Sequence, residues 1–461
     1  MGTSVIGGAL RAAIAIAALA AVGVALLTAS AATGAAGSPE SPAPNAGADR
    51  AAGDQADPVT NGDCFWLGAF SVRRGPDYNF AFPDYGATYW SARYTLPAGA
   101  TMRLKGKFPH ARYESLHSYA VGGSTPLDHL ADIDTAPDKG STNPFLPGAD
   151  RTAKKRRYTV AISPTTPPAA GEPRAANTVY AESSDQQLIY RVYVPDKGSD
   201  FAGDTGLPKP VLTLADGTVV TGQALCDAVG SEGHALSSSS LPLSVYLTLR
   251  DQPDKPSTFP AVNPTRFRAY YSTAFTVKCV YQGVCEPPPT RVGGQYSNLD
   301  VNYVGGFVNR EFGPVLVLRG KMPTTPATLK GNDKMKRAQL RYWSMCQNES
   351  LTTTRGAGCL FDEQVPLTKK RRFTIVTSLP ADRPDNARRK CGVGFIPWPA
   401  DGDGAGHPND GLLLVRNMLP SKSFHQAVQD TQVPGDEAEV MGPYLPKGSY
   451  SSVEQFEARG C

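Results

Sequence analysis

Residues 154–160 are Lys-Lys-Arg-Arg-Tyr-Thr-Val, and residues 369–375 repeat them as Lys-Lys-Arg-Arg-Phe-Thr-Ile. Residues 104–109 return in the same way at 318–323, and parts of 188–195 return within 413–420. The three blocks keep their order along the chain, with offsets of 214, 215 and 225 residues. An ordered set of matches of this kind predicts the internal duplication of a whole domain.

The blocks have the side-chain pattern of β-strands. Met102, Leu104 and Phe108 alternate with cationic residues, which places apolar groups on one face. Residues 188–194 and 412–419 are denser apolar runs, typical of strands buried between two sheets. Helical patterns are confined to short stretches, chiefly 221–229 and 452–459. We therefore expect an all-β fold of two tandem, duplicated β-sandwich or jelly-roll units with short helices at the unit ends.

The N-terminus predicts export. Arg11 is the only charged residue before Glu40, residues 12–27 are apolar, and the small residues 29–31 fit a signal-peptidase site near Ala31 or Ala32. Residues 1–32 are thus expected to be a signal peptide, with an uncleaved anchor as the alternative. A disordered Ala/Gly/Pro linker would follow at 33–62. The first sandwich unit is placed at 63–229, a connector at 230–290, and the second unit at 291–461.

The balanced charge and the missing motifs argue against several functions. The net charge is only +4, from 46 basic and 42 acidic residues, and no nucleic-acid-binding module is present, so nucleic acid is not expected as a partner. No transmembrane segment is expected after signal cleavage. Gly-x-Ser-x-Gly, His-Glu-x-x-His and phosphate-loop motifs are absent. Neither a cofactor nor a metal is therefore predicted.

Eight cysteines in an exported chain favour disulfides, since none has the paired spacing of a zinc site. Spacing alone leaves 105 pairings open. Aligning the repeats sets Cys346 against Tyr119 and Cys359 near Leu130, which makes the two cysteines cross-strand neighbours in a hairpin. Cys279 and Cys285 are close together in the connector, Cys64 and Cys226 bracket the first unit, and Cys391 and Cys461 remain. The prediction is therefore four bridges: Cys64–Cys226, Cys279–Cys285, Cys346–Cys359 and Cys391–Cys461.

Several segments resemble a known family. Residues 82–84, 88–90, 108–113 and 140–145 in the first half, and 340–344, 361–364 and 416–420 in the second, are similar to a family of uncharacterised exported bacterial proteins. They resemble more weakly a jelly-roll domain of unknown function. The resemblance covers most of residues 63–461 and implies a fold and a compartment, but no activity and no catalytic residues.

A catalytic constellation can be drawn only in the first unit. His117 and Tyr113 lie on one expected strand, and Asp132 follows the next, so a hairpin would bring them together as a base or metal ligand. Surface and core positions are the alternative interpretation. In our alignment the second unit has Ser344 where the first has His117. Any chemistry would therefore belong to unit one.

Cationic residues supply the binding candidates. Arg112 lies beside the His117 cluster, and Arg191 and Arg416 stand inside apolar strands, where a buried guanidinium needs a carboxylate; Asp132 and Asp362 are the expected partners. The runs 154–157 and 369–372 could bind an anionic polymer or form solvated turns. Residues 401–407 resemble a fragment of a calcium loop, but a Gly-rich hairpin turn is favoured because the far acidic ligand is missing.

Two functions remain open at this point. The first is a secreted or cell-envelope protein that binds a glycan, an anionic polymer or an envelope partner without catalysis. The second is a secreted hydrolase or metal-dependent enzyme with a site around His117. A concave pocket that joins His117, Asp132 and Tyr113 would favour the enzyme, and a filled hairpin would reject it.

Overall fold

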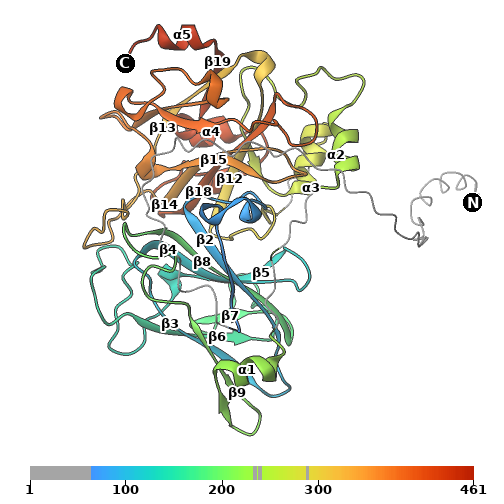
Figure 1. Cartoon of the computed structure of the whole chain (residues 1–461). Helices are drawn as coiled ribbons and strands as arrows, with labels where there is room; N and C mark the ends of the chain where they lie inside the picture. Colours follow the sequence, from blue (N-terminus) through green and yellow to red (C-terminus); the bar gives the residue numbers. More distant parts are fainter. Residues whose placement is uncertain (1–63, 232–235, 237–240, 287–289) are drawn as a thin grey trace, which may run out of the picture. The chain divides into compact units, whose positions relative to one another are not determined.

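The alternating blocks form strands in four sheets, seen in a computed structural model that describes residues 64–231, 236, 241–286 and 290–461 (Figure 1). The predicted signal peptide and linker lie outside the described residues. Within the described part, the all-β prediction is confirmed: the sheets have four or five strands each, and the helices are short.

The first half of the chain builds two five-stranded sheets. One sheet has the order β1 (Leu67–Phe70), β2 (Ala87–Thr95), β8 (Asp185–Pro195), β4 (Ala111–Tyr119) and β5 (Pro126–Ala131). The other has the order β10 (Val219–Val220), β9 (Lys209–Thr213), β3 (Thr101–Lys107), β6 (Arg157–Ser163) and β7 (Thr178–Tyr180). Their inner faces enclose one apolar core, in which Trp90, Leu104 and Val160 are buried. The first half is therefore a sandwich.

The second half repeats this order. One sheet has β11 (Arg268–Tyr270), β12 (Val301–Asn309), β18 (Asp410–Pro420), β14 (Leu340–Asn348) and β15 (Gly356–Phe361). The other has β17 (Gly394–Pro397), β16 (Arg372–Ser378), β13 (Val315–Lys321) and β19 (Lys447–Ser451). The blocks that begin at Lys154 and Lys369 lead into β6 and β16, which hold the same place in their sheets.

The boundaries of the units stay a prediction. All of the described residues belong to one compact unit. The strand β11, which lies in the segment expected to be a connector, pairs with β12 of the second half. It occupies the edge that β1 occupies in the first half.

The local patterns that predicted strands hold in detail. In β3 the side chains of Met102 and Leu104 are buried while Arg103 and Lys105 are exposed. The position between the two lysines is Gly106, where a Cβ atom would lie 2.3 Å from the ring of Tyr158 on the neighbouring strand. A side chain there would therefore displace the tyrosine from the core.

The helices are few and short: α1 (Gly222–Val229), α2 (Leu243–Arg250), α3 (Thr273–Thr276), α4 (Glu437–Met441) and α5 (Val453–Glu457). The helices α1 and α5 lie where the sequence places them. Ser452 caps α5 by accepting a hydrogen bond from the Gln455 amide, as expected for a serine at the start of the predicted helical stretch 452–459. Within the described part of the chain, no helix is long and apolar enough to cross a membrane.

All four predicted disulfides are present: Cys64–Cys226, Cys279–Cys285, Cys346–Cys359 and Cys391–Cys461. The alignment behind one of them was wrong by two residues. Ser115 and Ser344 lie opposite the equivalent Arg191 and Arg416, so Cys346 corresponds to His117 and not to Tyr119. Because side chains alternate along a strand, a shift of two residues keeps the same face, and the predicted pairing survived it.

Candidate functional site

The two halves meet through the sheet that contains β4 and the sheet that contains β14, and we call this contact the seam. An apolar cluster drawn from both sheets lies in it, including Tyr113, Tyr193, Tyr342 and Met418. Strongly polar side chains lie beside these apolar ones. The seam therefore differs from the two sandwich cores, which are mainly hydrophobic.

Two ion pairs cross the seam in a reciprocal way. Arg112 of β4 contacts both carboxylate oxygens of Asp362, which follows β15, at 2.7 Å. Arg341 of β14 contacts Asp132, which follows β5, at 2.8 and 3.0 Å. Each arginine and each aspartate holds the same register position in its own half. All four side chains are buried, so each pair excludes water from its contact.

These contacts correct the partners expected for Arg191 and Arg416. Asp132 and Asp362 pair across the seam with Arg341 and Arg112 instead. The sequence shows that an arginine in an apolar strand needs an acceptor, but it does not show which distant segment lies against that face.

Arg191 and Arg416 lie at equivalent points of the central strands β8 and β18. Arg416 lies 3.5 Å from the Asp84 carboxylate and donates a hydrogen bond to the Phe82 carbonyl at 2.6 Å. Arg191 donates to the Tyr119 hydroxyl and, at 2.5 Å, to the Tyr296 carbonyl. Its Nη1 atom has no hydrogen-bond partner among the described residues, although the side chain is 1% exposed. A buried guanidinium with an unused donor is costly.

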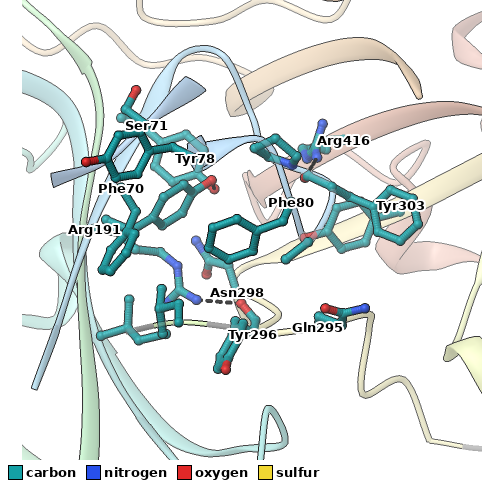
Figure 2. Close-up of a pocket in the computed structure, with 17 residues that line it drawn as sticks. Phe70, Ser71, Tyr78, Phe80, Arg191, Gln295, Tyr296, Asn298, Tyr303 and Arg416 are labelled. Atoms are coloured by element: carbon teal, nitrogen blue, oxygen red, sulfur yellow. Dashed lines mark hydrogen bonds between the residues drawn. The ribbon is translucent and has the colours of Figure 1, made fainter. Parts of the chain in front are cut away.

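Both arginines line a pocket at the seam, which we call the seam pocket. Its cavity volume is about 60 Å³. In the view of Figure 2, Arg191 lies on one side of it and Arg416 on the other, with the ring of Phe80 between them. The other described residues of its lining are mostly aromatic or apolar: Phe70, Ser71, Tyr78, Ala81, Phe82, Pro83, Tyr89, Ile189, Tyr193, Leu236, Gln295, Tyr296, Asn298 and Tyr303.

The aromatic side of the pocket comes from the segment between β1 and β2. The rings of Tyr78 and Phe80 pack edge-on against Phe70, with centroids 6.1 and 6.3 Å apart. All three rings are half-buried, so part of each faces the outside. These residues were missed from the sequence because they look like a loop. The cluster of Phe80, Phe82 and Pro83 is the signal that could have marked them.

The backbone at this segment is strained. Ala81 and Phe82 have φ values of 58° and 52°, in the left-handed region that non-glycine residues rarely adopt. Hydrogen bonds from their amides to Thr354 of the second half hold this conformation, with the Phe82 amide 2.8 Å from the Thr354 carbonyl. The strained segment thus depends on contacts across the seam.

The geometry does not assemble the catalytic cluster expected around His117. The ring is fully buried, and its Nε2 atom accepts a hydrogen bond from the Leu299 amide at 3.1 Å. Burial, followed by the charge of Arg191, lowers the pKa of His117 well below its usual value, so the ring is neutral. Tyr113 donates to Asp300 at 2.6 Å and Asp132 is paired with Arg341. The pocket that Asp132 lines contains neither His117 nor Tyr113.

The remaining candidates from the sequence are the two basic runs and the segment 401–407. Lys154, Lys155 and the run 369–370 are exposed at turns before β6 and β16. Residues 401–407 connect β17 to β18, which belong to different sheets, so the expected hairpin turn is wrong. Asp403, His407 and Asp410 lie close enough there to hold a cation. Their carboxylates already accept hydrogen bonds, including those from Tyr246 and Arg250.

One titrating group was not expected. Glu114 points into the core of the first sandwich, where the hydroxyls of Tyr190 and Tyr158 donate to it at 2.5 and 3.2 Å. Burial raises the pKa of Glu114 to about 8 in spite of these two bonds. Its equivalent in the second half is Trp343, an apolar residue. The carboxyl group is therefore protonated in the folded chain at neutral pH.

This burial predicts that stability falls as the pH rises from about 4.5 to about 8. In that range the folded state keeps a proton that the unfolded chain, titrating near 4.5, has released, so deprotonation favours unfolding. Between pH 5 and pH 8, the free energy of unfolding of the wild type should fall by about 2–4 kcal/mol because of this group. We expect this fall to be absent from Glu114→Gln when unfolding by urea is measured at each pH. The exposed Glu172→Gln variant is the control. A Glu114→Gln protein with an unchanged pH dependence would contradict the assignment.

Comparison with known proteins gives the following results. No family model matches the sequence, and no curated protein matches it. Among solved structures the chain is similar to a protein of Burkholderia cenocepacia, at 12% identity and a TM-score of 0.42 over 82% of this chain and 79% of that one. It is also similar to a Vibrio parahaemolyticus protein, at 12% identity and a TM-score of 0.37, covering 78% of this chain and 91% of that one. Both are uncharacterised bacterial proteins.

Proposed function

We propose that this chain is a secreted or cell-envelope protein that binds a glycan or another envelope polymer in the seam pocket without catalysis. The observation that carries the proposal is the pocket itself, where half-buried aromatic rings lie beside buried arginines. Ligand sites are typically apolar and aromatic concavities with a few convergent polar groups. A sugar ring offers C–H faces to such rings and hydroxyl groups to the polar atoms.

Two further observations support the proposal. The four disulfides are typical of an oxidising compartment outside the cytoplasm, where the apolar N-terminal run would direct the chain. The strained backbone at Ala81 and Phe82 lies in the pocket lining, and strain of this kind concentrates at functional sites. The enzyme alternative lacks comparable support, because His117 is enclosed and neutral.

The test is a screen of the mature protein against a panel of envelope glycans and polymers, repeated with a Phe80→Ala variant. We expect that variant to bind any retained polymer at least tenfold more weakly, a loss of about 1.4 kcal/mol, because it removes the ring at the centre of the pocket. Phe312→Ala removes another half-buried ring, which packs on Tyr450 outside the pocket, and should bind normally. If the mature protein binds none of the polymers, or if the Phe80→Ala and Phe312→Ala variants bind equally well, the proposal is refuted.

A further inference from the structure

We infer that the ligand of the seam pocket carries a carboxylate, which binds Arg191. This inference rests on the proposed function and narrows its ligand to an acidic one. It begins with the buried arginines of the seam. Arg112, Arg341 and Arg416 each lie near an aspartate, at 2.7, 2.8 and 3.5 Å. No ion pair within 4 Å joins Arg191 to a carboxylate among the described residues, so none of these residues supplies its counterion.

The duplication identifies the missing carboxylate. Tyr89 and Tyr303 lie opposite Arg191 and Arg416 on the neighbouring strands, which fixes the correspondence between the two halves. Asp84 stands five residues before Tyr89, and Asn298 stands five residues before Tyr303. Both side chains accept a hydrogen bond from the amide two residues ahead, at 2.8 and 3.0 Å. The second half thus keeps the turn but replaces the acid with a neutral amide.

The pocket has space where that counterion is missing. Arg191 and Asn298 both line it, and the unused Nη1 donor of Arg191 belongs to a side chain that is 99% buried. A volume of about 60 Å³ exceeds the roughly 10–15 Å³ that a cavity needs to hold one water molecule, and it suits a small planar group. A carboxylate matches the planar arrangement of N–H donors on a guanidinium. When the two groups pair inside a protein, both lose their water.

The neighbours of Arg191 hold its guanidinium in place for such a ligand. It lies 5.7 Å from the ring centre of Tyr89 and 5.5 Å from that of Tyr119. The Tyr296 carbonyl and the Tyr119 hydroxyl use Nη2, which leaves Nη1 as the available donor. Among the described residues, the guanidinium groups of Arg191 and Arg416 line the pocket and the Asp84 carboxylate lies 3.5 Å from Arg416, so a singly charged anion would balance these three charges. The half-buried rings of Phe70, Tyr78 and Phe80 would contact the rest of the ligand.

The test uses three probes and two variants of the mature full-length protein. Calorimetric titration with glucuronate, glucose and glycerol 1-phosphate compares a carboxylate, a neutral sugar and a phosphate. We expect glucuronate to bind at least tenfold more tightly than the other two. Asn298→Asp supplies an internal carboxylate at the position of Asp84, and should weaken glucuronate binding at least tenfold. Arg191→Gln should do the same, while the exposed Gln282→Glu change, outside the pocket lining, should leave it unaltered.

The outcomes separate this inference from the proposed function. Tighter binding of glycerol 1-phosphate would overturn the carboxylate assignment. Equal binding of glucose, absence of glucuronate binding, or an Asn298→Asp protein that binds glucuronate as well as the wild type does would also overturn it. In each of these cases, polymer binding that is still lost in Phe80→Ala would leave the proposed function standing. If Arg191→Gln does not fold, the Asn298→Asp result decides, because that variant retains every hydrogen-bond acceptor of the side chain.

Discussion

Arg112→Met is expected to lower the free energy of unfolding by about 3–5 kcal/mol. The guanidinium is fully buried and contacts both oxygens of Asp362, the Glu363 carboxylate and, at 3.0 Å, the hydroxyl of Thr328. Its removal takes the ion-pair partner from both acidic groups, of which Asp362 is buried and Glu363 is 13% exposed. Urea unfolding of the variant and the wild type measures the loss.

The control for this prediction is a solvent-exposed pair. Arg93 lies 3.5 Å from Asp185, with side chains that are 41% and 46% exposed, so Arg93→Met should change stability by less than about 1 kcal/mol. Adding Asp362→Leu to Arg112→Met should restore part of the loss, since it removes one of the unpaired charges. Equal effects of Arg112→Met and Arg93→Met would show that the seam pair contributes no more than a surface one.

Loss of the Cys64–Cys226 disulfide is expected to cost about 4–5 kcal/mol in a Cys64→Ala, Cys226→Ala double variant. The bridge joins residues 162 positions apart, and a long loop gains much conformational freedom in the unfolded chain when it is opened. The matched control is the Cys279–Cys285 bridge, which spans only 6 positions and should cost about half as much by the same relation. Thermal and urea unfolding of both double variants provide the comparison, and a larger loss for the short loop would refute the loop-length argument.

The strands, their buried faces and the disulfides could be predicted from the sequence, because they depend on local alternation of side chains and on the repeat. Met102 and Leu104 alternate with charged residues, a pattern typical of a half-buried strand, and the burial in β3 follows it. His117 lies between repeat blocks with offsets of 214 and 215 residues, but its equivalent, Cys346, lies 229 positions away, because the connection from β13 to β14 is longer than that from β3 to β4. The register of Cys346 relative to His117 could therefore not be fixed without the pairing to β8 and β18.

The contacts of the seam could not be predicted from the sequence for a different reason. The alternation of side chains shows that Arg112 and Arg191, each on its own strand, lie on a face with apolar residues. It does not show which segment packs against that face. The partner of Arg112 is 250 positions away, and the carbonyl that Arg191 contacts is 105 positions away. Arg191 and Arg416 could still be singled out, because a cation inside an apolar strand is rare enough to draw attention without any partner. Phe70, Tyr78 and Phe80 offered only a weaker signal, the clustering of Phe80 with Phe82 and Pro83.

The reciprocal ion pairs of the seam have the form of an isologous dimer interface. In such a dimer, residue i of one copy contacts residue j of the other, and j contacts i in return. Arg112 with Asp362, and Arg341 with Asp132, fulfil this relation inside one polypeptide. Two separate identical chains would have to keep both ends of their interface alike, since every substitution would appear twice. A covalent link removes that constraint, which lets one end hold Asp84 and the other Asn298, and lets His117 and His129 on one side correspond to a disulfide on the other. The fused chain can thus pair the arginine at one end of its interface with an internal aspartate, while the arginine at the other end faces a neutral asparagine.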